Sequence, residues 1–300
     1  MRRGLIIVSL AATVAAVAAA FAGASQSTYP GGRGRLAFAV NRANVDIYSV
    51  LPNGGGMQRL TTERAFDACP SWSRDGKTIA YCSDASGAFE VWTMRADGSG
   101  KHRETNLDSN ATFPDLSPDG TRIVFSDCAR TCRLMVVDRA TGKESVLVDD
   151  KAAEDTDPVW SPNGRLIAFL RAPKGGSLRG AQIYIARADG SRVRQVTKDR
   201  HPKGPFGPDW RPDGAVLAYA SGGDIWTADL RGRTRRVTSD KASEFAPAWS
   251  PDGSQLAYIR RTAAVRQIYA VRANGSSARP VAPAVRGAHM APSWQPVGPP

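Results

Sequence analysis

The sequence predicts an all-β fold, a six-bladed β-propeller in which each blade is a four-stranded antiparallel sheet. Two observations carry this prediction. A unit of the form Pro-x-Trp-Ser-Pro-Asp-Gly recurs along the 300 residues, and short apolar runs separated by polar turns follow it. The copies begin at Pro70, Pro114, Pro158, Pro208, Pro247 and Pro292, so their starts lie 44, 44, 50, 39 and 45 residues apart. Such a period is typical of repeat folds in which each unit is one sheet.

Each unit opens with a strand and a tight turn. The strand is Pro-x-Trp-Ser, with Leu116 in place of tryptophan in the second copy, and the turn reads Pro-Asp-Gly or a close variant. Proline presets φ for the first turn position, and glycine accepts the positive φ that closes a hairpin. We interpret the repeated tryptophan as packing between blades. The Asp-Gly turns do not predict calcium loops, which need several carboxylates at alternating positions.

Three further strands complete the unit. The second ends in an aromatic residue, as in Leu256-Ala257-Tyr258. The third centres on a pair such as Ile268-Tyr269, and the fourth carries Val-Thr or Leu-Thr, as in Val237-Thr238. Short runs rich in β-branched and aromatic residues with Asp-Gly or Asn-Gly turns between them indicate antiparallel strands.

The first and last units are incomplete in complementary ways. The second-strand sequence Leu36-Ala37-Phe38 has no Pro-x-Trp-Ser before it, and the final Pro-x-Trp, residues 292–294, has no strand after it. We therefore expect the C-terminal strand to complete the N-terminal blade. This pairing would close the ring and remove the open sheet edges of a linear array.

The N-terminus predicts a signal peptide over residues 1–24. A short basic start, Met1-Arg2-Arg3, precedes an apolar run over 5–22 and small residues at 22–24. Residues 25–32 would then be a short linker and 33–300 the propeller of an exported protein, whether periplasmic, envelope-bound or secreted. The alternative is an uncleaved N-terminal membrane anchor, because the run is close to the minimum length of a membrane span.

Four cysteines in an exported chain suggest disulfides. We expect Cys69–Cys82 across one hairpin and Cys128–Cys132 across the next tight loop. The simplest register places Cys69 opposite Tyr81, so the first bond requires an irregularity near Pro70. A zinc site made by all four thiolates is the alternative, although the cysteines lack paired zinc-type spacing.

The chain is basic, with a formal net charge of +12 and a pI ≈ 10.0. On an exported protein this charge favours anionic envelope polymers or a phospholipid surface as partners, and it fits nucleic acid poorly. The alternative is a solvated, arginine-rich surface with no specific partner. We expect a monomer.

The combined repeat stands most cleanly at residues 158–197 and 247–281. It resembles the WD40-like propeller repeats of the TolB family over about nine-tenths of the chain. The resemblance implies a propeller and an envelope location. TolB carries an α/β domain ahead of its propeller; its N-terminal segment contacts TolA, and the propeller binds the lipoprotein Pal. Here only about eight residues separate the signal from the first blade strand, too few for a domain, so the resemblance does not extend to the TolA contact.

No catalytic motif is present in the sequence. It contains no Gly-x-Ser-x-Gly, no His-Glu-x-x-His and no phosphate-binding glycine loop, and it has three histidines. We therefore expect a noncatalytic binding protein without a cofactor or metal. Similar blades also occur in oligogalacturonate lyases, so a polysaccharide-active lyase or hydrolase remains the alternative.

The loops that join the fourth strand of one blade to the first strand of the next should surround one mouth of the central channel. Charged and aromatic groups around such a concavity suit recognition, with basic groups for an anionic partner and phenyl rings as anchors. The candidate partner-binding residues are Arg64, Phe66, Glu154, His201, Lys203, Phe206, Lys241, Glu244, Phe245, Arg286 and His289.

Overall fold

The structure is a computed structural model that describes residues 32–41, 44–175, 180–199, 201, 206–263, 265–282 and 288–298. For Phe206 and residues 288–290 it describes the backbone alone. The predicted signal peptide and nearly all of the predicted linker lie outside the described residues. Within the described part of the chain, no helix is long and apolar enough to cross a membrane.

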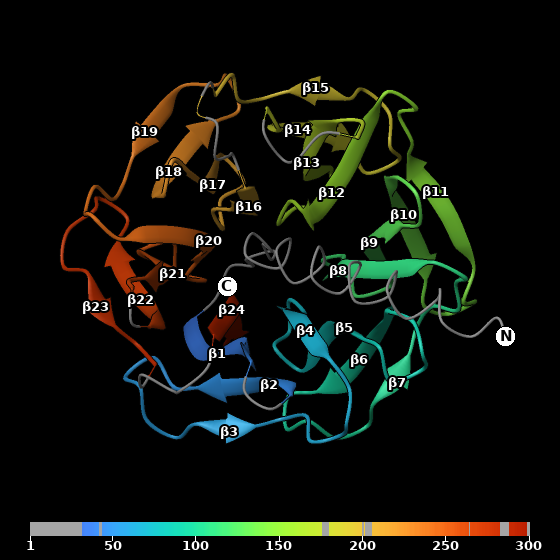
Figure 1. The fold of residues 1–300 in the computed structure, drawn as a ribbon, viewed down its shortest axis with the longest axis horizontal. Coiled ribbons are helices and arrows are strands. Elements are labelled where there is room, and N and C mark those ends of the chain that lie inside the picture. The colour runs from blue at the N-terminus through green and yellow to red at the C-terminus, as the bar shows by residue number, and fades with distance from the viewer. Residues whose placement is uncertain are drawn as a thin grey trace, which may run out of the picture.

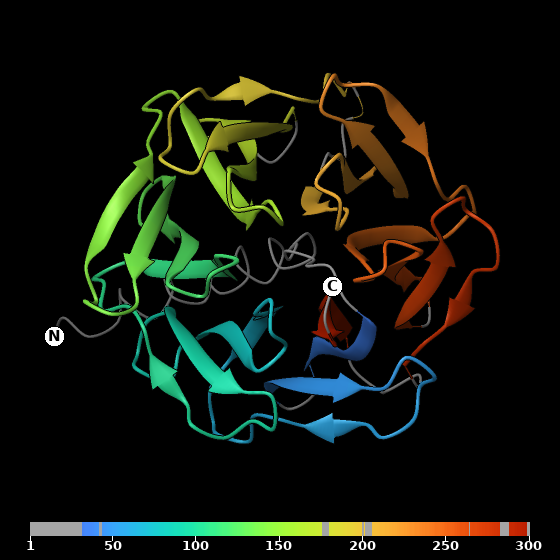
Figure 2. The same cartoon turned by 180° about the vertical axis from the view of Figure 1, so that it is seen from behind.

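Twenty-four strands form six four-stranded antiparallel sheets arranged in a ring, which confirms the predicted six-bladed propeller (Figures 1 and 2). The first strand of each blade lies nearest the centre of the ring and the short fourth strand lies at the rim. From the centre outward, the strands are β24 (Ala288–Val297), β1 (Gly32–Asn41), β2 (Val45–Val50) and β3 (Gln58–Arg59) in blade 1; β4 (Asp67–Trp72), β5 (Thr78–Ser83), β6 (Glu90–Arg95) and β7 (His102–Arg103) in blade 2; β8 (Asn110–Leu116), β9 (Arg122–Cys128), β10 (Cys132–Asp138) and β11 (Glu144–Val148) in blade 3; β12 (Ala153–Trp160), β13 (Leu166–Pro173), β14 (Gln182–Arg187) and β15 (Arg194–Gln195) in blade 4; β16 (Phe206–Trp210), β17 (Val216–Ser221), β18 (Asp224–Asp229) and β19 (Thr234–Arg236) in blade 5; and β20 (Ser243–Trp249), β21 (Gln255–Arg261), β22 (Arg266–Arg272) and β23 (Arg279–Pro280) in blade 6.

The ring closes as the incomplete repeats predict. Strand β24 from the C-terminus pairs antiparallel with β1 from the N-terminus, with Trp294 opposite Leu36 and Ser293 opposite Ala37. The closing blade therefore joins the two ends of the chain in one sheet, and β24 covers the edge of β1 that would otherwise be open.

In four of the blades, a serine directly after the first strand holds the hairpin turn that follows it. In blade 6, Ser250 Oγ donates to Asp252 Oδ1 at 2.6 Å and accepts from the amide of Gln255 at 2.9 Å. Gly253 has φ of 68°, and its amide donates to the carbonyl of Ser250 at 2.7 Å. The same serine bonds recur in the turns after Ser73, Ser117 and Ser161. The motif is therefore turn chemistry, as predicted.

In four blades, a threonine two residues after the fourth strand has a similar recurring role. The hydroxyl of Thr238 accepts from the amide of Ile225 at 2.9 Å, and Thr61, Thr105 and Thr197 accept from the matching amides of their own blades. Each hydroxyl satisfies a buried amide at the start of a third strand, which explains why Val-Thr or Leu-Thr recurs although the fourth strand is short.

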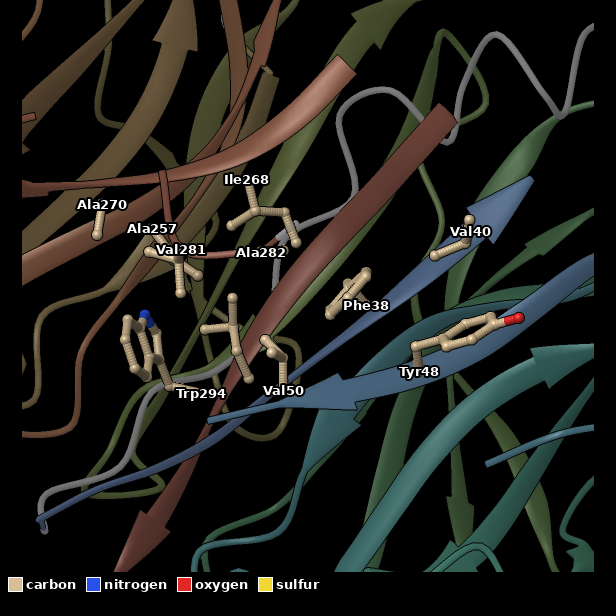
Figure 3. Packing of buried hydrophobic residues seen from close by; sticks show 12 residues of the cluster. Phe38, Val40, Tyr48, Val50, Ala257, Ile268, Ala270, Val281, Ala282 and Trp294 are labelled. Atoms are coloured by element: carbon tan, nitrogen blue, oxygen red, sulfur yellow. The ribbon is translucent and has the colours of Figure 1, made fainter. Parts of the chain in front are cut away.

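The tryptophans pack between blades, as their spacing predicts. Trp72, Trp160 and Trp210 are fully buried, and Trp249 and Trp294 are 1% exposed. Figure 3 shows the junction of blades 6 and 1, where Trp294 lies in one apolar cluster with Val50 and with Val281, which follows blade 6. Aromatic rings of this size contribute a large part of the buried apolar area.

Buried side chains at the position before the tryptophan link the blades by hydrogen bonds. Asp115 in blade 3 is fully buried; its Oδ1 accepts from Ser71 Oγ in blade 2 at 2.7 Å, and its Oδ2 accepts from the amide of Trp160 in blade 4 at 2.7 Å. Asp209 in blade 5 accepts from the amide of Trp249 in blade 6 at 2.5 Å. These carboxylates link one innermost strand to the next by hydrogen bonds.

One residue in each innermost strand adopts a left-handed backbone conformation. It always precedes the proline of the repeat, and five of the six copies are not glycine. The register of each first strand is irregular there, as in a β-bulge. The six residues are Cys69, Phe113, Asp157, Gly207, Ala246 and Ala291, with φ between 45° and 55°.

The bulge corrects one of the two predicted disulfides. Cys128 and Cys132 are bonded, as predicted, whereas Cys69 and Cys82 are free and buried. The expected irregularity near Pro70 does exist, but it places Ala68 opposite Cys82 and leaves Cys69 within the bulge. The thiol of Cys82 donates instead to the carbonyl of Ala68 at 3.4 Å.

Candidate functional site on the loop face

The antiparallel order divides the ring into two faces. First strands run away from the connections between blades, and second strands return to them. The connections between blades and the hairpins between second and third strands therefore lie at one end, which we call the loop face. The Pro-Asp-Gly turns and the hairpins between third and fourth strands lie at the other end, the turn face.

The predicted partner-binding residues divide by exposure. Arg64, His201 and Lys241 are exposed, and Phe66 and Glu154 are half-buried. Glu244 is 2% and Phe245 9% exposed, so neither is a free surface group. Phe206 and His289 belong to β16 and β24, but their side chains are not described; Lys203 and Arg286 lie outside the described residues.

Several of these residues belong to strands, although the sequence analysis placed them in loops. The first strands begin before the proline of the repeat: β20 starts at Ser243 and β12 at Ala153. Glu154, Glu244 and Phe245 therefore pair with the second strand of their blade. The bulge before the proline lets the first strand continue past the point at which proline removes an amide from the ladder.

One cleft lies between blades 4 and 5. It measures about 780 Å³ and is lined by the predicted His201, by the aromatic residues Tyr219 and Trp226, and by polar groups that include Arg236. Arg236 is neutralised there by Asp224, at 2.7 Å between Nη2 and Oδ2. Burial raises the pKa of the Tyr219 phenol, which therefore stays protonated at neutral pH.

The second cleft, of about 500 Å³, opens beside blade 6. Its lining includes the predicted Lys241 together with Ser243, Arg260 and Arg261. Arg260 Nε lies 2.8 Å from Asp240 Oδ2. The arginines of this cleft are not among the predicted residues, because they lie at the hairpin between second and third strands and not in a connection between blades. A run of basic residues without acidic ones, 260–266, was the available signal.

Three buried carboxyl groups occupy one position, two residues before the bulge, on the first strands of three blades: Asp67, Asp155 and Glu244. Asp155 accepts two hydrogen bonds from Arg171, at 2.7 Å and 2.8 Å, although burial still raises its pKa. Burial raises the pKa of Asp67 to about 6 and that of Glu244 to about 7. The Thr238 hydroxyl opposes the shift of Glu244.

The pKa of Glu244 predicts that stability depends on pH. Its ordinary pKa is 4.5, whereas the folded protein holds the proton up to about pH 7. The folded state binds more protons across this interval, so the free energy of unfolding contributed by Glu244 falls as the pH rises from 4.5 to about 7. Replacing Glu244 with Gln should leave stability unchanged near about pH 4 and increase it by about 3 kcal/mol near about pH 8.

Urea unfolding of the parent and of Glu244→Gln across this pH range measures the effect. The change Asp108→Asn, at an exposed carboxyl, is the control and should leave the pH profile unaltered. Parallel profiles for the parent and Glu244→Gln would show that the pKa of Glu244 is not raised.

The described residues contain no group of three or more His, Cys, Asp or Glu side chains placed to hold a metal ion. The geometry of the loop face is suited to recognition, because it combines two open clefts, uncompensated basic groups and hydroxyls.

Comparisons with known proteins agree with the fold. A family model described as the TolB beta propeller domain matches residues 2–179 and 167–299. The uncharacterized protein Atu1656 of Agrobacterium fabrum is 29% identical over 179 residues, which are 57% of this chain and 60% of that protein. A TolB homologue of Chlorobium luteolum is 32% identical over 148 residues, 49% of this chain and 32% of the homologue. The chain thus spans less than two thirds of the length of these curated relatives.

Two solved structures show a similar fold. TolB from Acinetobacter baumannii matches with a TM-score of 0.76 and 20% identity, over 88% of this chain and 67% of that one. An oligogalacturonate lyase in complex with manganese matches with a TM-score of 0.57 and 17% identity, over 84% and 74%. At these identities the likeness concerns the fold alone. The family match, in contrast, covers nearly the whole sequence, and the chain belongs to the TolB beta propeller domain family.

Proposed function

We propose that this protein is an exported, noncatalytic propeller that binds a protein or an anionic polymer of the cell envelope through its loop face. The observation that carries the proposal is the cleft beside blade 6, where Lys241 and Arg261 are exposed and the carboxylate of Asp240 is already engaged by Arg260. Basic groups that the protein does not neutralise attract an anionic partner and orient it.

The family and the N-terminal sequence support the location. The TolB relatives suggest an envelope protein, and residues 1–24 have the layout of a signal peptide. The net charge of +12 is compatible with weak association with an anionic membrane surface. We propose that the protein acts as a monomer.

A capture experiment tests the proposal. Immobilised mature protein is incubated with envelope extract of its own host, beside two double variants that each remove two positive charges. Arg64→Ala/Lys241→Ala alters the loop face, and Arg74→Ala/Arg165→Ala alters exposed residues of the turn face. We expect capture of an envelope component to fall at least about fivefold in the loop-face variant, roughly 1 kcal/mol, and to be unchanged in the turn-face variant. Equal capture by all three proteins would contradict the use of the loop face.

The likeness to an oligogalacturonate lyase supports one alternative function, that of a polysaccharide-active lyase or hydrolase. Incubation with an acidic polysaccharide and measurement of chain length separate it from the proposal. If the protein depolymerised the polysaccharide and a chelator stopped the reaction, its function would be catalysis and not binding alone.

A further inference from the structure

Two arginines face each other across the hairpin between β21 and β22. Arg261 and Arg266 are directly opposed in the strand register, on the loop face of blade 6. Their guanidinium carbons lie 5.9 Å and 5.6 Å from the centre of one ring, that of Phe245. Like charges directly opposite one another on a sheet are destabilising. Packing against the Phe245 ring alone does not explain why the two positive charges lie together.

No carboxylate of this protein neutralises the pair. In the part of the chain that the structure describes, neither Arg261 nor Arg266 forms an ion pair, and the nearby Asp240 is taken by Arg260. The undescribed segments contain no aspartate or glutamate at all, so their side chains cannot supply the missing charge. Glu244, the acidic residue of β20, keeps its proton up to about pH 7.

Arg266 is also half-buried, and its charge is thereby disfavoured. Burial lowers the pKa of its guanidinium, and the charge of Arg261 adds to that effect. A partly desolvated cation beside a second cation gains from an anion that pairs with both, because the anion offsets their mutual repulsion and the loss of water.

Blade 4 shows how the same fold treats a guanidinium that it neutralises itself. Arg171 also lies over aromatic rings, at 5.5 Å from Phe169 and 5.1 Å from Tyr184. It is held by Asp155 at 2.7 Å and by Asp150 at 3.0 Å. Contact between arginine and aromatic rings therefore occurs here with internal counterions, and the pair in blade 6 lacks them.

The cleft of about 500 Å³ adjoins the pair and shares Arg261 with it. We infer that Arg261 and Arg266 form an oxyanion site, which binds the carboxylate or phosphate group of an anionic polysaccharide lying in this cleft. Each arginine presents a planar fork of donors that matches such a group. Lys241 extends the positive surface along the cleft, and the hydroxyl of Ser243 lines the same cleft, where it can meet a sugar hydroxyl.

The lining favours a glycan over an acidic peptide. Among the described residues of the lining, the apolar side chains are those of Ala242 and Ala263, and the Phe245 ring is buried beneath the two arginines. Protein partners usually contribute aromatic or aliphatic anchors that need apolar pockets, and this cleft offers none. A hydroxyl-rich chain with repeated charges suits it better.

The site rests on the proposed function and names its ligand class. The test uses isothermal titration of the mature protein at low salt with four probes of six units each: hexamannuronate, a glucan hexamer phosphorylated on each sugar, hexaglutamate and a neutral glucan hexamer. We expect one or both anionic glycan probes to bind, the neutral glucan to show no binding, and affinity to fall as salt rises. The first two probes distinguish carboxylate from phosphate as the recognised oxyanion.

The double variant Arg261→Ala/Arg266→Ala should weaken binding of the anionic glycan at least about tenfold. The turn-face variant Arg74→Ala/Arg165→Ala, which removes the same charge, should change it less than about twofold. Equal weakening by both variants would show that net charge alone attracts the glycan. This result would contradict the oxyanion site. Tighter binding of hexaglutamate than of either glycan would assign the cleft to acidic proteins instead.

The two proposals can fail separately. If the arginine variant still captures the envelope component of the parent, the loop-face function stands and the oxyanion site is wrong. If the parent binds an anionic glycan through Arg261 and Arg266 but captures nothing from the envelope, the site stands and the function does not.

Discussion

Deletion of residues 288–300 is expected to abolish the stable fold. These residues form β24, the innermost strand of blade 1, which pairs with β1 and contacts the innermost strands of both neighbouring blades, β4 and β20. Without it, β1 becomes an open edge in the middle of the ring, and an apolar face loses its cover. We expect the free energy of unfolding to fall by more than about 5 kcal/mol, which is comparable with the whole stability of many domains.

A graded series identifies the cause of that loss. Trp294 is 1% exposed, and Trp294→Ala should cost about 3–5 kcal/mol through a cavity at the junction of blades 6 and 1. Val297 on the same strand is 41% exposed, and Val297→Ala should cost less than about 0.5 kcal/mol. Thermal and urea unfolding followed by circular dichroism measure all three variants. A truncated protein that melts with the parent would show that the ring does not depend on β24.

The repeat makes most of this fold predictable from the sequence. Each strand and turn has its own local signal, such as the Ser-x-Asp-Gly turn or the Val-Thr of the fourth strand, and six copies reinforce one another. Ring closure follows from counting, because the two incomplete units complement each other. These features are local in sequence or set by the number of repeats, and a single sequence is enough to show them.

The conformation before each proline was not predictable in this way. The residue before proline is usually extended, yet Cys69, Phe113 and their counterparts are left-handed. A bulge in the innermost strand outweighs the local preference, because the strand must pair with its neighbour on both sides of the proline. The wrong prediction of a Cys69–Cys82 bond follows directly from that unrecognised shift in register.

The site was predictable only in outline. The order of the strands placed Lys241 and His201 on one face, and both line clefts there. The arginine pair was missed, because the opposition of Arg261 and Arg266 depends on hairpin register and the absence of counterions on tertiary packing. Burial of Glu244 and Phe245 was missed for a related reason, since the start of β20 cannot be read from a motif that begins at Pro247.

Replacement of Asp115 with Ala should be the most destabilising substitution of a polar residue. The change removes the acceptor for the hydroxyl of Ser71 and for the amide of Trp160, which belong to the two neighbouring blades and are both buried. Loss of the bonds that these two buried donors make should cost about 3–5 kcal/mol together. Asp115→Asn should cost less, because its amide oxygen can still accept one of the two bonds.

Urea unfolding of both variants, with Asp108→Ala as a control at an exposed carboxyl, measures these costs. The control removes a carboxyl group from the surface and should change stability by less than about 0.5 kcal/mol. Asp115→Ala should also weaken the cooperativity of unfolding, because it releases blade 3 from blades 2 and 4 together. If Asp115→Ala matched the control, the hydrogen bonds between innermost strands would be dispensable, and apolar packing between blades would hold the ring alone.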